Sequence, residues 1–459
     1  MDAPRDARPG PAEGSPQLVR GLGLPGATSL VAGTIIGTGI FLSPSIVARE
    51  VGAPGLSLVV WVVCGVLAAC GALSFAELGA AIPRAGGTYA FLHRAFGRPW
   101  LPFLFGWSML AVVLTGVMAA VATAFAIYAG YFLEGVIPYG VWTQRAVAVS
   151  CILFLTGMNI LGVRVGGRIQ VTFTVVKVAA LAALVLVGLI LGGGGGAPPG
   201  SLSPLLPDDR TPAATLGAFG TAMIVALFAF NGWWYATFVA EEVRQPERNV
   251  PRAILLGLGA VLLLYLLANV VYLRVLPFEQ LQATDRPAAD AMQALVGPAG
   301  AGFIALAVML SAFGTLNAQL LSIPRVYYAM ARDGLFFDAV ARVHPRFHTP
   351  AMAILIQGLW ASVLALTGTF AQIIGYTAFP NYAFLALGVL GLMVLRRREP
   401  HLHRPFRVWG YPVTPLLFLL VFAWYLGNSL VYAFQPTMVG ILLTLSGVPL
   451  YLYWHRRAP

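Results

Sequence analysis

Twelve long apolar runs, separated by short charged segments, make up most of the 459-residue sequence. A helix needs about 20 apolar residues to cross the ~30 Å hydrocarbon core of a bilayer, and each run is about that long or longer. Only 10% of the residues are charged, against about 25% in soluble globular proteins, which excludes a soluble enzyme or a nucleic-acid-binding protein. The sequence therefore predicts an all-α polytopic membrane protein, embedded in the lipid bilayer, with twelve transmembrane helices near 24–48, 55–82, 101–132, 141–161, 166–191, 214–240, 251–276, 298–330, 349–367, 369–395, 411–432 and 435–454.

The basic residues predict the orientation of these helices, because cytoplasmic segments of membrane proteins are enriched in Lys and Arg. With a cytoplasmic N-terminus, 22 of the 28 basic residues lie on the cytoplasmic side. The opposite side receives only Arg49, Arg145, Arg210, Arg274 and Arg286. We therefore predict a multi-pass protein of the cell membrane, inner or plasma, with both termini in the cytoplasm.

One predicted cytoplasmic segment, 83–100, places basic residues between aromatic ones, including Tyr89, Phe91 and Phe96. This pattern is typical of an amphipathic helix that lies at the membrane surface. An ordinary basic loop explains the composition equally well, and the sequence leaves both interpretations open.

Two of the runs are interrupted near their middle. The first contains Gly33, Gly37 and Gly39 with two threonines, and the sixth contains Asn231 and Gly232. Unwound backbone at membrane depth is tolerated only where it lines a cavity, because an unsatisfied N–H or C=O facing lipid costs several kcal/mol. Close helix packing through small residues is the alternative explanation.

The two interruptions are five spans apart, and a repeat of five spans is inverted in the membrane. Interrupted helices at corresponding positions of inverted repeats are typical of a transporter whose substrate binds at the bilayer midplane. The sequence predicts five segments in chain order. They are a disordered cytoplasmic tail (1–20), a first repeat of helices 1–5 (21–191), a Gly/Pro-rich outer loop (192–213), a second repeat of helices 6–10 (214–398), and helices 11–12 with a short cytoplasmic C-terminus (399–459).

Broken helices can bind a zwitterion through backbone atoms alone, because one half begins with free N–H groups and the other ends with free C=O groups. We expect the substrate carboxylate at the N–H groups of Gly37, Thr38 and Gly39. We expect the ammonium at the carbonyls of Ile35, Phe228 and Asn231. Neither contact needs a charged side chain, a metal ion or a cofactor.

Lys177 is the only lysine of the chain and lies near the middle of the fifth run. At 1.5 Å per residue its position is roughly 20 Å from either end, too far for its ammonium to reach the membrane surface comfortably. A charge there costs at least ~2.5 kcal/mol on insertion scales, so it should face a polar cavity or cap backbone carbonyls. We predict that Lys177 caps carbonyls near the first break and replaces a coupling cation, which makes sodium coupling unnecessary.

Five stretches of the sequence together resemble the amino acid/polyamine/organocation (APC) superfamily of permeases. They are GTIIGTGIF from Gly33, SFAELGAAIPRAGGTYAFL from Ser74, FAFNGWW from Phe228, FGTLNAQLLSIPRVYYAMARDG from Phe313 and LRRREPHLHRPFRV from Leu395. Within the superfamily the chain is most similar to the L-type amino acid transporters and their bacterial neutral amino acid exchangers. The resemblance implies the leucine-transporter fold, a five-plus-five inverted repeat with broken helices 1 and 6 and two additional helices, and transport by alternating access.

Matched by position, the resemblance implies substrate contacts at Ile35, Gly37, Thr38 and Gly39. It also implies an aromatic gate at Phe228 and a functional lysine on the fifth helix at Lys177. The chain departs from the animal members at Asn231, Gly232 and Trp233, where they often carry Gly-Gly-Trp, so we expect a smaller or more polar pocket. The outer loop 132–141 has no cysteine, so no disulfide-linked heavy chain is expected there.

These observations favour a sodium-independent transporter of neutral amino acids that works as an exchanger. A proton-coupled symporter in which Lys177 titrates is the alternative within this class. A non-transporting amino acid sensor is the alternative from another class, although the predicted inner loops are too short for a signalling domain. A channel and an enzyme have less support, because the runs show no carbonyl filter sequence and the six histidines lack metal-ligand spacing.

Overall fold

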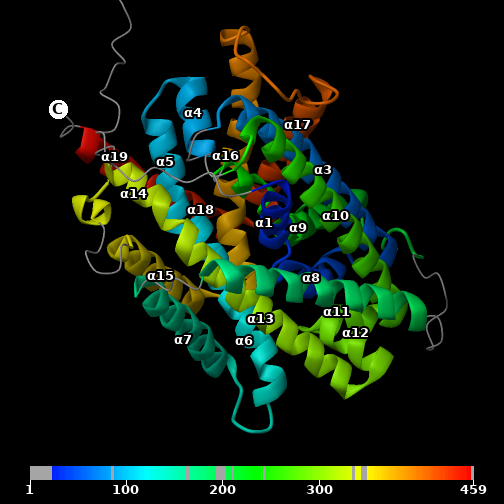
Figure 1. Ribbon diagram of the computed structural model, residues 1–459. Coiled ribbons are helices and arrows are strands. Elements are labelled where there is room, and N and C mark those ends of the chain that lie inside the picture. The colour runs from blue at the N-terminus through cyan, green and yellow to red at the C-terminus, as the bar shows by residue number, and fades with distance from the viewer. Residues whose placement is uncertain are drawn as a thin grey trace, which may run out of the picture.

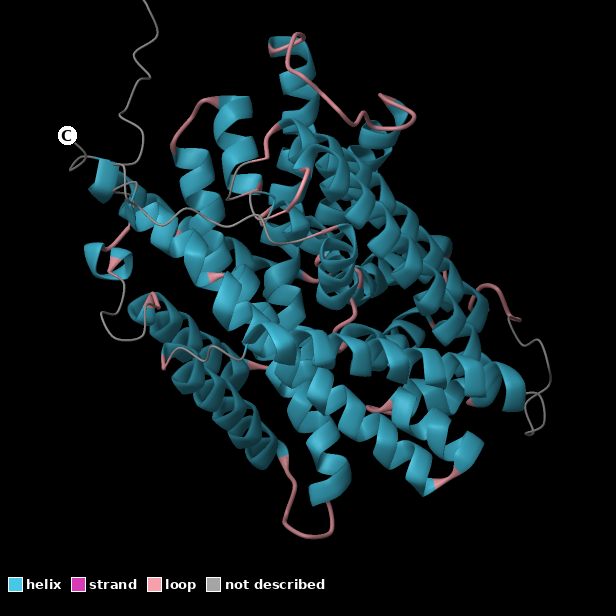
Figure 2. Ribbon diagram, in the orientation of Figure 1, coloured by secondary structure: helices cyan, strands magenta, loops and turns pink. Residues whose placement is uncertain are grey.

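The structure, a computed structural model, consists of a bundle of helices that cross one another at varied angles (Figure 1). It describes residues 23–83, 87–161, 166–192, 203–208, 210–238, 240, 243–332, 336–342 and 349–455. The predicted tail 1–20 lies outside these residues, and so does half of the predicted outer loop 192–213. The described residues form helices joined by turns and loops, with no β-strand among them (Figure 2). The all-α prediction is confirmed.

The helices follow the predicted runs. Ten helical segments are long and apolar enough to cross a membrane, and the shorter apolar helices Val175–Leu191 and Ala351–Thr367 bring the number in the described part of the chain to twelve. In chain order the elements are α1 Leu24–Ile35, α2 Gly39–Val51, α3 Pro54–Ala81, α4 Thr88–Phe96, α5 Trp100–Ser108, η1 Met109–Val113, α6 Leu114–Leu133, α7 Val141–Ile160, α8 Gly166–Leu191, α9 Pro212–Ala229, η2 Trp233–Thr237, α10 Pro246–Val275, α11 Phe278–Ala283, α12 Pro287–Val296, α13 Pro298–Ser322, α14 Pro324–Arg332, η4 Asp338–Ala341, α15 Ala351–Thr367, α16 Phe370–Arg398, α17 Val413–Tyr432, α18 Phe434–Leu445 and α19 Gly447–His455.

Local sequence explains where many of these helices begin. A proline occupies one of the first two positions of α1, α3, α9, α10, α12 and α13. Proline suits this place because its φ is already helical and its missing N–H would have no partner in the first turn. The gap between the ninth and tenth runs is also real, because Thr369 and Gln372 form a capping box that starts α16. The eighth run is shorter than predicted, since α13 ends before Pro324 begins α14.

The segment 83–100 contains a short helix, α4, rather than an irregular basic loop. Phe91, Leu92 and Ala95 are buried on one face, whereas His93 and Arg94 are exposed on the other. The structure therefore favours the amphipathic helix of the two interpretations that the sequence leaves open.

Both predicted breaks are present, and they pack against each other. The first separates α1 from α2 at residues 36–38, and the second separates α9 from η2 at residues 230–232. A Cβ added to Gly39 would lie 2.6 Å from Ala229 Cα, so only glycine allows α2 to approach α9 so closely. Gly232 has a φ of +120°, and a Cβ there would lie 2.8 Å from the Thr34 carbonyl oxygen. The interruptions are therefore sites of close contact between α1–α2 and α9–η2 as well as breaks.

The buried core surrounds these breaks. The span α5–η1–α6 is almost wholly buried, whereas α7, α17 and α18 are buried over only a minority of their length and carry many exposed apolar side chains. In a membrane protein such exposed apolar side chains face lipid. Figure 1 shows α7 at the margin of the bundle and α1 in its middle.

A carboxylate without any exposed surface, Glu77, holds one end of the bundle together. It accepts hydrogen bonds from Arg396 Nε at 2.8 Å and from the Val408 backbone N–H at 2.7 Å. A second guanidinium, that of Arg404, has its Nε 3.4 Å from the carboxylate and donates to the Leu395 carbonyl at 3.1 Å. We call these four groups (Glu77, Arg396, Arg404 and the Val408 N–H) the Glu77 cluster. It joins the end of α3 to the end of α16 and to the loop before α17.

We predict that Glu77→Gln destabilises the protein by about 3 kcal/mol, because it leaves largely buried guanidinium groups without their counter-charge. Glu399→Gln is the matched control, because Glu399 pairs with Arg94 in a partly exposed ion pair of the kind that contributes at most about 1 kcal/mol. Thermal unfolding of the detergent-purified variants measures both effects. Equal shifts of the melting temperature would contradict a structural role of the buried carboxylate.

Candidate functional site

A small cavity lies between the two breaks. Both breaks contribute to its wall, together with α6, η2 and α13, and the lining residues are Thr34, Ile35, Gly37, Thr38, Gly39, Val117, Val121, Phe228, Ala229, Asn231, Tyr235, Thr315 and Gln319. Its volume is about 30 Å³, enough for about two water molecules but not for an amino acid. The structure therefore represents a closed form, whose side chains must separate before a substrate can enter.

The first break exposes the N-terminal end of α2 to this cavity. The Gly37 N–H turns back to the Ile35 carbonyl at 2.8 Å, so it is already engaged in the closed form. The Thr38 and Gly39 N–H groups precede the first full turn of α2, where helical N–H groups have no partner within their own helix. Of the three N–H groups predicted for the substrate carboxylate, these two are thus the better placed.

The second break orients its polar groups through local hydrogen bonds. The Trp234 indole N–H donates to the Asn231 side-chain oxygen at 2.8 Å, and the Thr34 hydroxyl donates to the Gly232 carbonyl at 3.1 Å. The Asn231 N–H donates to the Phe228 carbonyl at 3.0 Å. Gly232 therefore contacts the end of α1, and it is not one of the residues that line the cavity.

Trp233 also points away from the cavity. Its ring packs edge-on against Phe75 with a centroid distance of 5.3 Å, and it fills the space beside Gly71 on α3. The sequence predicts Trp233 to be near the substrate because it follows the second break directly. In the closed form its side chain belongs to the packing between η2 and α3.

Phe228 separates the small cavity from a larger one. Its ring packs edge-on against Phe370, the first residue of α16, with a centroid distance of 5.7 Å. Phe370 lines an open cavity of about 300 Å³ whose wall also contains Arg49, Glu50 and Arg145. The two rings therefore lie between the two cavities, where an aromatic gate would have to move.

Lys177 reaches the first break from α8. Its side chain is 1% exposed, and its ammonium donates a hydrogen bond to the Gly33 carbonyl in the last turn of α1. In an uninterrupted helix that carbonyl would accept from the Gly37 N–H, but here the Gly37 N–H donates to the Ile35 carbonyl. The lysine thus takes the place of the backbone donor that the break removes. Whether it also serves in coupling stays a prediction.

Tyr265 on α10 is a contributor that the sequence analysis missed. Its hydroxyl lies 2.9 Å from the Ile35 carbonyl oxygen and 3.1 Å from the Ala229 carbonyl oxygen, so it links the two breaks. The Ile35 carbonyl, predicted to bind the substrate ammonium, therefore already has two donors, and a substrate would have to displace one of them. A tyrosine within an apolar run is ordinarily assigned to the membrane interface, which explains why the sequence did not single it out.

Two further polar atoms beside the cavity have no hydrogen-bond partner within the described part of the chain. They are the Thr38 hydroxyl and the Gln319 side-chain oxygen, both from residues that line the cavity. Buried polar groups are normally paired, so these atoms are candidates for contacts with a bound substrate. Gln319 comes from α13, which the sequence analysis had not connected with the site.

The chain matches the amino acid permease family over residues 22–446. It is 33% identical to Asc-type amino acid transporter 1 of Mus musculus over 451 residues, which covers 96% of this chain and 82% of the relative. It is 32% identical to the large neutral amino acids transporter small subunit 2 of Homo sapiens, with 98% of this chain and 84% of the relative covered. Identity to the cystine/glutamate transporter of Homo sapiens is 30%, with 97% and 88% covered.

These relatives are transporters by name, which agrees with the prediction that the chain is not an enzyme. They also agree with the resemblance drawn from the sequence motifs and with the twelve apolar helices of the described residues. The match extends across both breaks and α16, so it includes every segment that forms the closed cavity.

We predict that Tyr265→Phe slows transport about tenfold, because the two breaks lose the hydroxyl that links their carbonyls, at a cost of about 1 to 3 kcal/mol. Tyr272→Phe is the matched control on the same helix, since its hydroxyl makes one longer bond of 3.3 Å to the Ile40 carbonyl. Uptake of radiolabelled amino acid into proteoliposomes gives the rates. Equal rates for the two variants would mean that the link between the breaks has no special role.

Proposed function

The chain belongs to the amino acid permease family, and we propose from this premise that it exchanges neutral amino acids by alternating access without sodium. The observation that carries the proposal is the hydrogen bond from Lys177 to the Gly33 carbonyl beside the first break. A fixed ammonium at this carbonyl supplies the positive charge that a bound cation would otherwise supply. No sodium ion is then needed to stabilise the break.

The chemistry of the cavity wall supports a neutral substrate. All thirteen lining residues carry uncharged side chains. A zwitterion can place its carboxylate at the N–H groups of Thr38 and Gly39 and its ammonium at the carbonyls of the breaks. A substrate with a further charge on its side chain would find no opposite charge in this wall, and burying an unpaired charge is strongly unfavourable. Val117, Val121 and Tyr235 narrow the remaining space and favour small side chains.

A proton-coupled symporter is the second candidate, and the burial of Lys177 favours it. The Lys177 amine is 1% exposed and, among the residues that the structure describes, it contacts the uncharged Gly33 carbonyl and no carboxylate. Under this alternative Lys177 releases and rebinds a proton in each transport cycle. Under the first proposal it stays charged throughout.

The proposed setting follows from the charge distribution. Both termini lie in the cytoplasm, the chain crosses the plasma or inner membrane, and helices 1–5 and 6–10 form the two inverted repeats. No disulfide-linked heavy chain is expected, because the three cysteines, Cys64, Cys70 and Cys151, are all buried.

Purified protein in proteoliposomes tests these proposals. Exchange requires unlabelled amino acid inside the vesicles for uptake of labelled amino acid, whereas a symporter takes up substrate when only an inward proton gradient is present. We expect uptake that depends on internal neutral amino acid and is unchanged when Na⁺ replaces K⁺. Uptake that rises steeply with Na⁺ would overturn the proposal.

We predict that Lys177→Ala reduces exchange at least tenfold at every pH from about 5 to 8, because the Gly33 carbonyl loses its donor in a dry site. Arg397→Ala is the control, since it removes an exposed cation at the end of α16. Equal amounts of reconstituted protein are compared. Full activity of Lys177→Ala would exclude a role for the lysine, and a wild-type rate that follows the proton gradient would favour the symporter.

We predict that Phe228→Ala lowers the turnover rate about tenfold while changing substrate affinity less, because the ring lies between the two cavities. Phe219→Ala is the matched control on the same helix, where the ring packs against Trp424 on α17. Exchange rates in proteoliposomes are compared with affinities from thermal shift. If both variants turn over at the wild-type rate, Phe228 is not the gate.

A further inference from the structure

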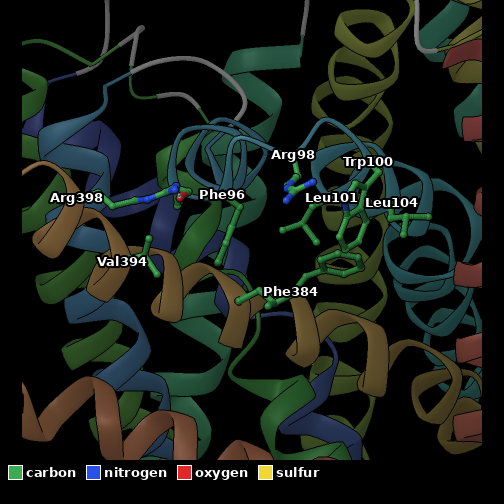
Figure 3. Close-up of a pocket in the computed structure, with 10 residues that line it drawn as sticks. Phe96, Arg98, Trp100, Leu101, Leu104, Phe384, Val394 and Arg398 are labelled. Atoms are coloured by element: carbon green, nitrogen blue, oxygen red, sulfur yellow. Dashed lines mark hydrogen bonds between the residues drawn. The ribbon is translucent and has the colours of Figure 1, made fainter.

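A second large cavity lies outside the transport site, at the corner where α4 turns into α5 beside α16. Its volume is about 560 Å³. We call it the corner pocket and define it by its lining residues, Ala95, Phe96, Arg98, Trp100, Leu101, Leu104, Phe384, Leu387, Val394 and Arg398. Figure 3 shows the labelled side chains converging on the pocket from the corner and from α16.

The interior of the corner pocket is apolar. Leu101 and Leu104 come from α5, and Phe384 and Val394 come from α16. Both helices belong to apolar segments long enough to cross the membrane, so the interior of the pocket lies between two predicted membrane spans. An interior of this kind accommodates an alkyl chain and offers nothing to a small hydrophilic ion.

The charged residues of the pocket are both arginines, Arg98 and Arg398. Figure 3 shows them on either side of Phe96, with Phe384 beneath. Arg398 donates one N–H to the Ala95 carbonyl at 3.1 Å, and a guanidinium has four further N–H groups to offer. Within the described residues neither arginine forms an ion pair, and the nearby Glu399 is paired with Arg94 at 2.6 Å. The hydrogen bond from Arg94 lowers the pKa of Glu399, which keeps that pair charged and intact.

Trp100 adds an independent indication of where the pocket lies in the membrane. It is 44% exposed although it lines the pocket. Tryptophan is enriched at the boundary between hydrocarbon and headgroups. The same end of the bundle carries the arginine-rich end of α16 and is the side predicted to be cytoplasmic, where anionic lipids concentrate.

We propose that the corner pocket binds an anionic glycerophospholipid, with the headgroup phosphate at Arg98 and Arg398 and one acyl chain among the apolar side chains. Arginine binds phosphate through parallel charge-assisted hydrogen bonds, which accounts for the two cations. A free phosphate ion would leave the apolar interior empty, and a neutral lipid would leave the arginines without a counter-charge. An anionic lipid satisfies both parts.

Such a lipid would contact two spans that also border the transport site. The span of α5 continues as α6, whose Val117 and Val121 line the substrate cavity. The other end of α16 is Phe370, which packs against Phe228. A lipid in the corner pocket would therefore affect how the α5–α6 span packs against α16, and both of these spans border the substrate cavity or its proposed gate.

Native mass spectrometry of the detergent-purified full chain, titrated with phosphatidylglycerol or phosphatidylcholine, tests the proposal. We expect preferential binding of phosphatidylglycerol, weakened about fivefold by Arg98→Gln or by Arg398→Gln and about twentyfold by both together. Arg397→Gln is the control, because it removes a neighbouring exposed cation that does not line the pocket. If Arg397→Gln weakens binding as much as the other two variants, the attraction is a general surface charge and the proposal is wrong.

A second variant tests the apolar half. Val394→Trp fills the interior while both arginines remain, and we expect it to lower phosphatidylglycerol binding as much as the double arginine variant. Melting temperatures without added lipid show whether each variant is folded. Displacement of the lipid by millimolar inorganic phosphate, or unchanged binding to a folded Val394→Trp, would show that an anion alone is recognised and would overturn the proposal.

Discussion

The hydrogen bond between Lys177 and the Gly33 carbonyl is the contact that makes the broken first span possible. A helix interrupted in a dry environment leaves carbonyls without donors, and each unsatisfied group costs about 1 to 3 kcal/mol. The break diverts the Gly37 N–H to the Ile35 carbonyl, and the only lysine of the chain supplies the missing donor. The break can then persist in the closed form, and α2 can begin beside the cavity with the free N–H groups that an anion needs.

The second break is joined to the end of α1 and to the first break by hydrogen bonds. Thr34 donates to the Gly232 carbonyl, and Tyr265 lies within hydrogen-bond distance of a carbonyl from each break. The contacts between the breaks therefore form one network, in which a substrate ammonium bound as we propose would compete with the Tyr265 hydroxyl for the Ile35 carbonyl. If the substrate ammonium displaces the Tyr265 hydroxyl from the Ile35 carbonyl, the hydrogen-bond link between the two breaks is lost. Substrate binding would then loosen the closed form.

Charged side chains form a cluster at one end of the bundle and are absent from the wall of the central cavity. The cavity wall has no charged side chain, whereas the Glu77 cluster ties α3, α16 and the loop before α17 together with several charge-assisted hydrogen bonds. Strong bonds at one end keep these spans in register. Apart from the Lys177 ammonium, the contacts at the breaks are hydrogen bonds between uncharged groups, which can exchange at smaller cost, as the proposed alternating access would require.

Hydropathy alone locates the twelve spans, because the length of an apolar run is a local property that the bilayer thickness dictates. The two breaks and the exceptional Lys177 are also visible in the sequence, since glycine clusters and a lysine inside a span each violate a local rule. Tyr265, Gln319 and the Glu77 cluster were not predicted. Each depends on partners far away in the sequence, such as Glu77 and Arg396, or Tyr265 and Ile35. The direction of Trp233 was decided in the same way, because the side that a ring faces depends on the helix that packs beside it, here α3 with Phe75 and Gly71.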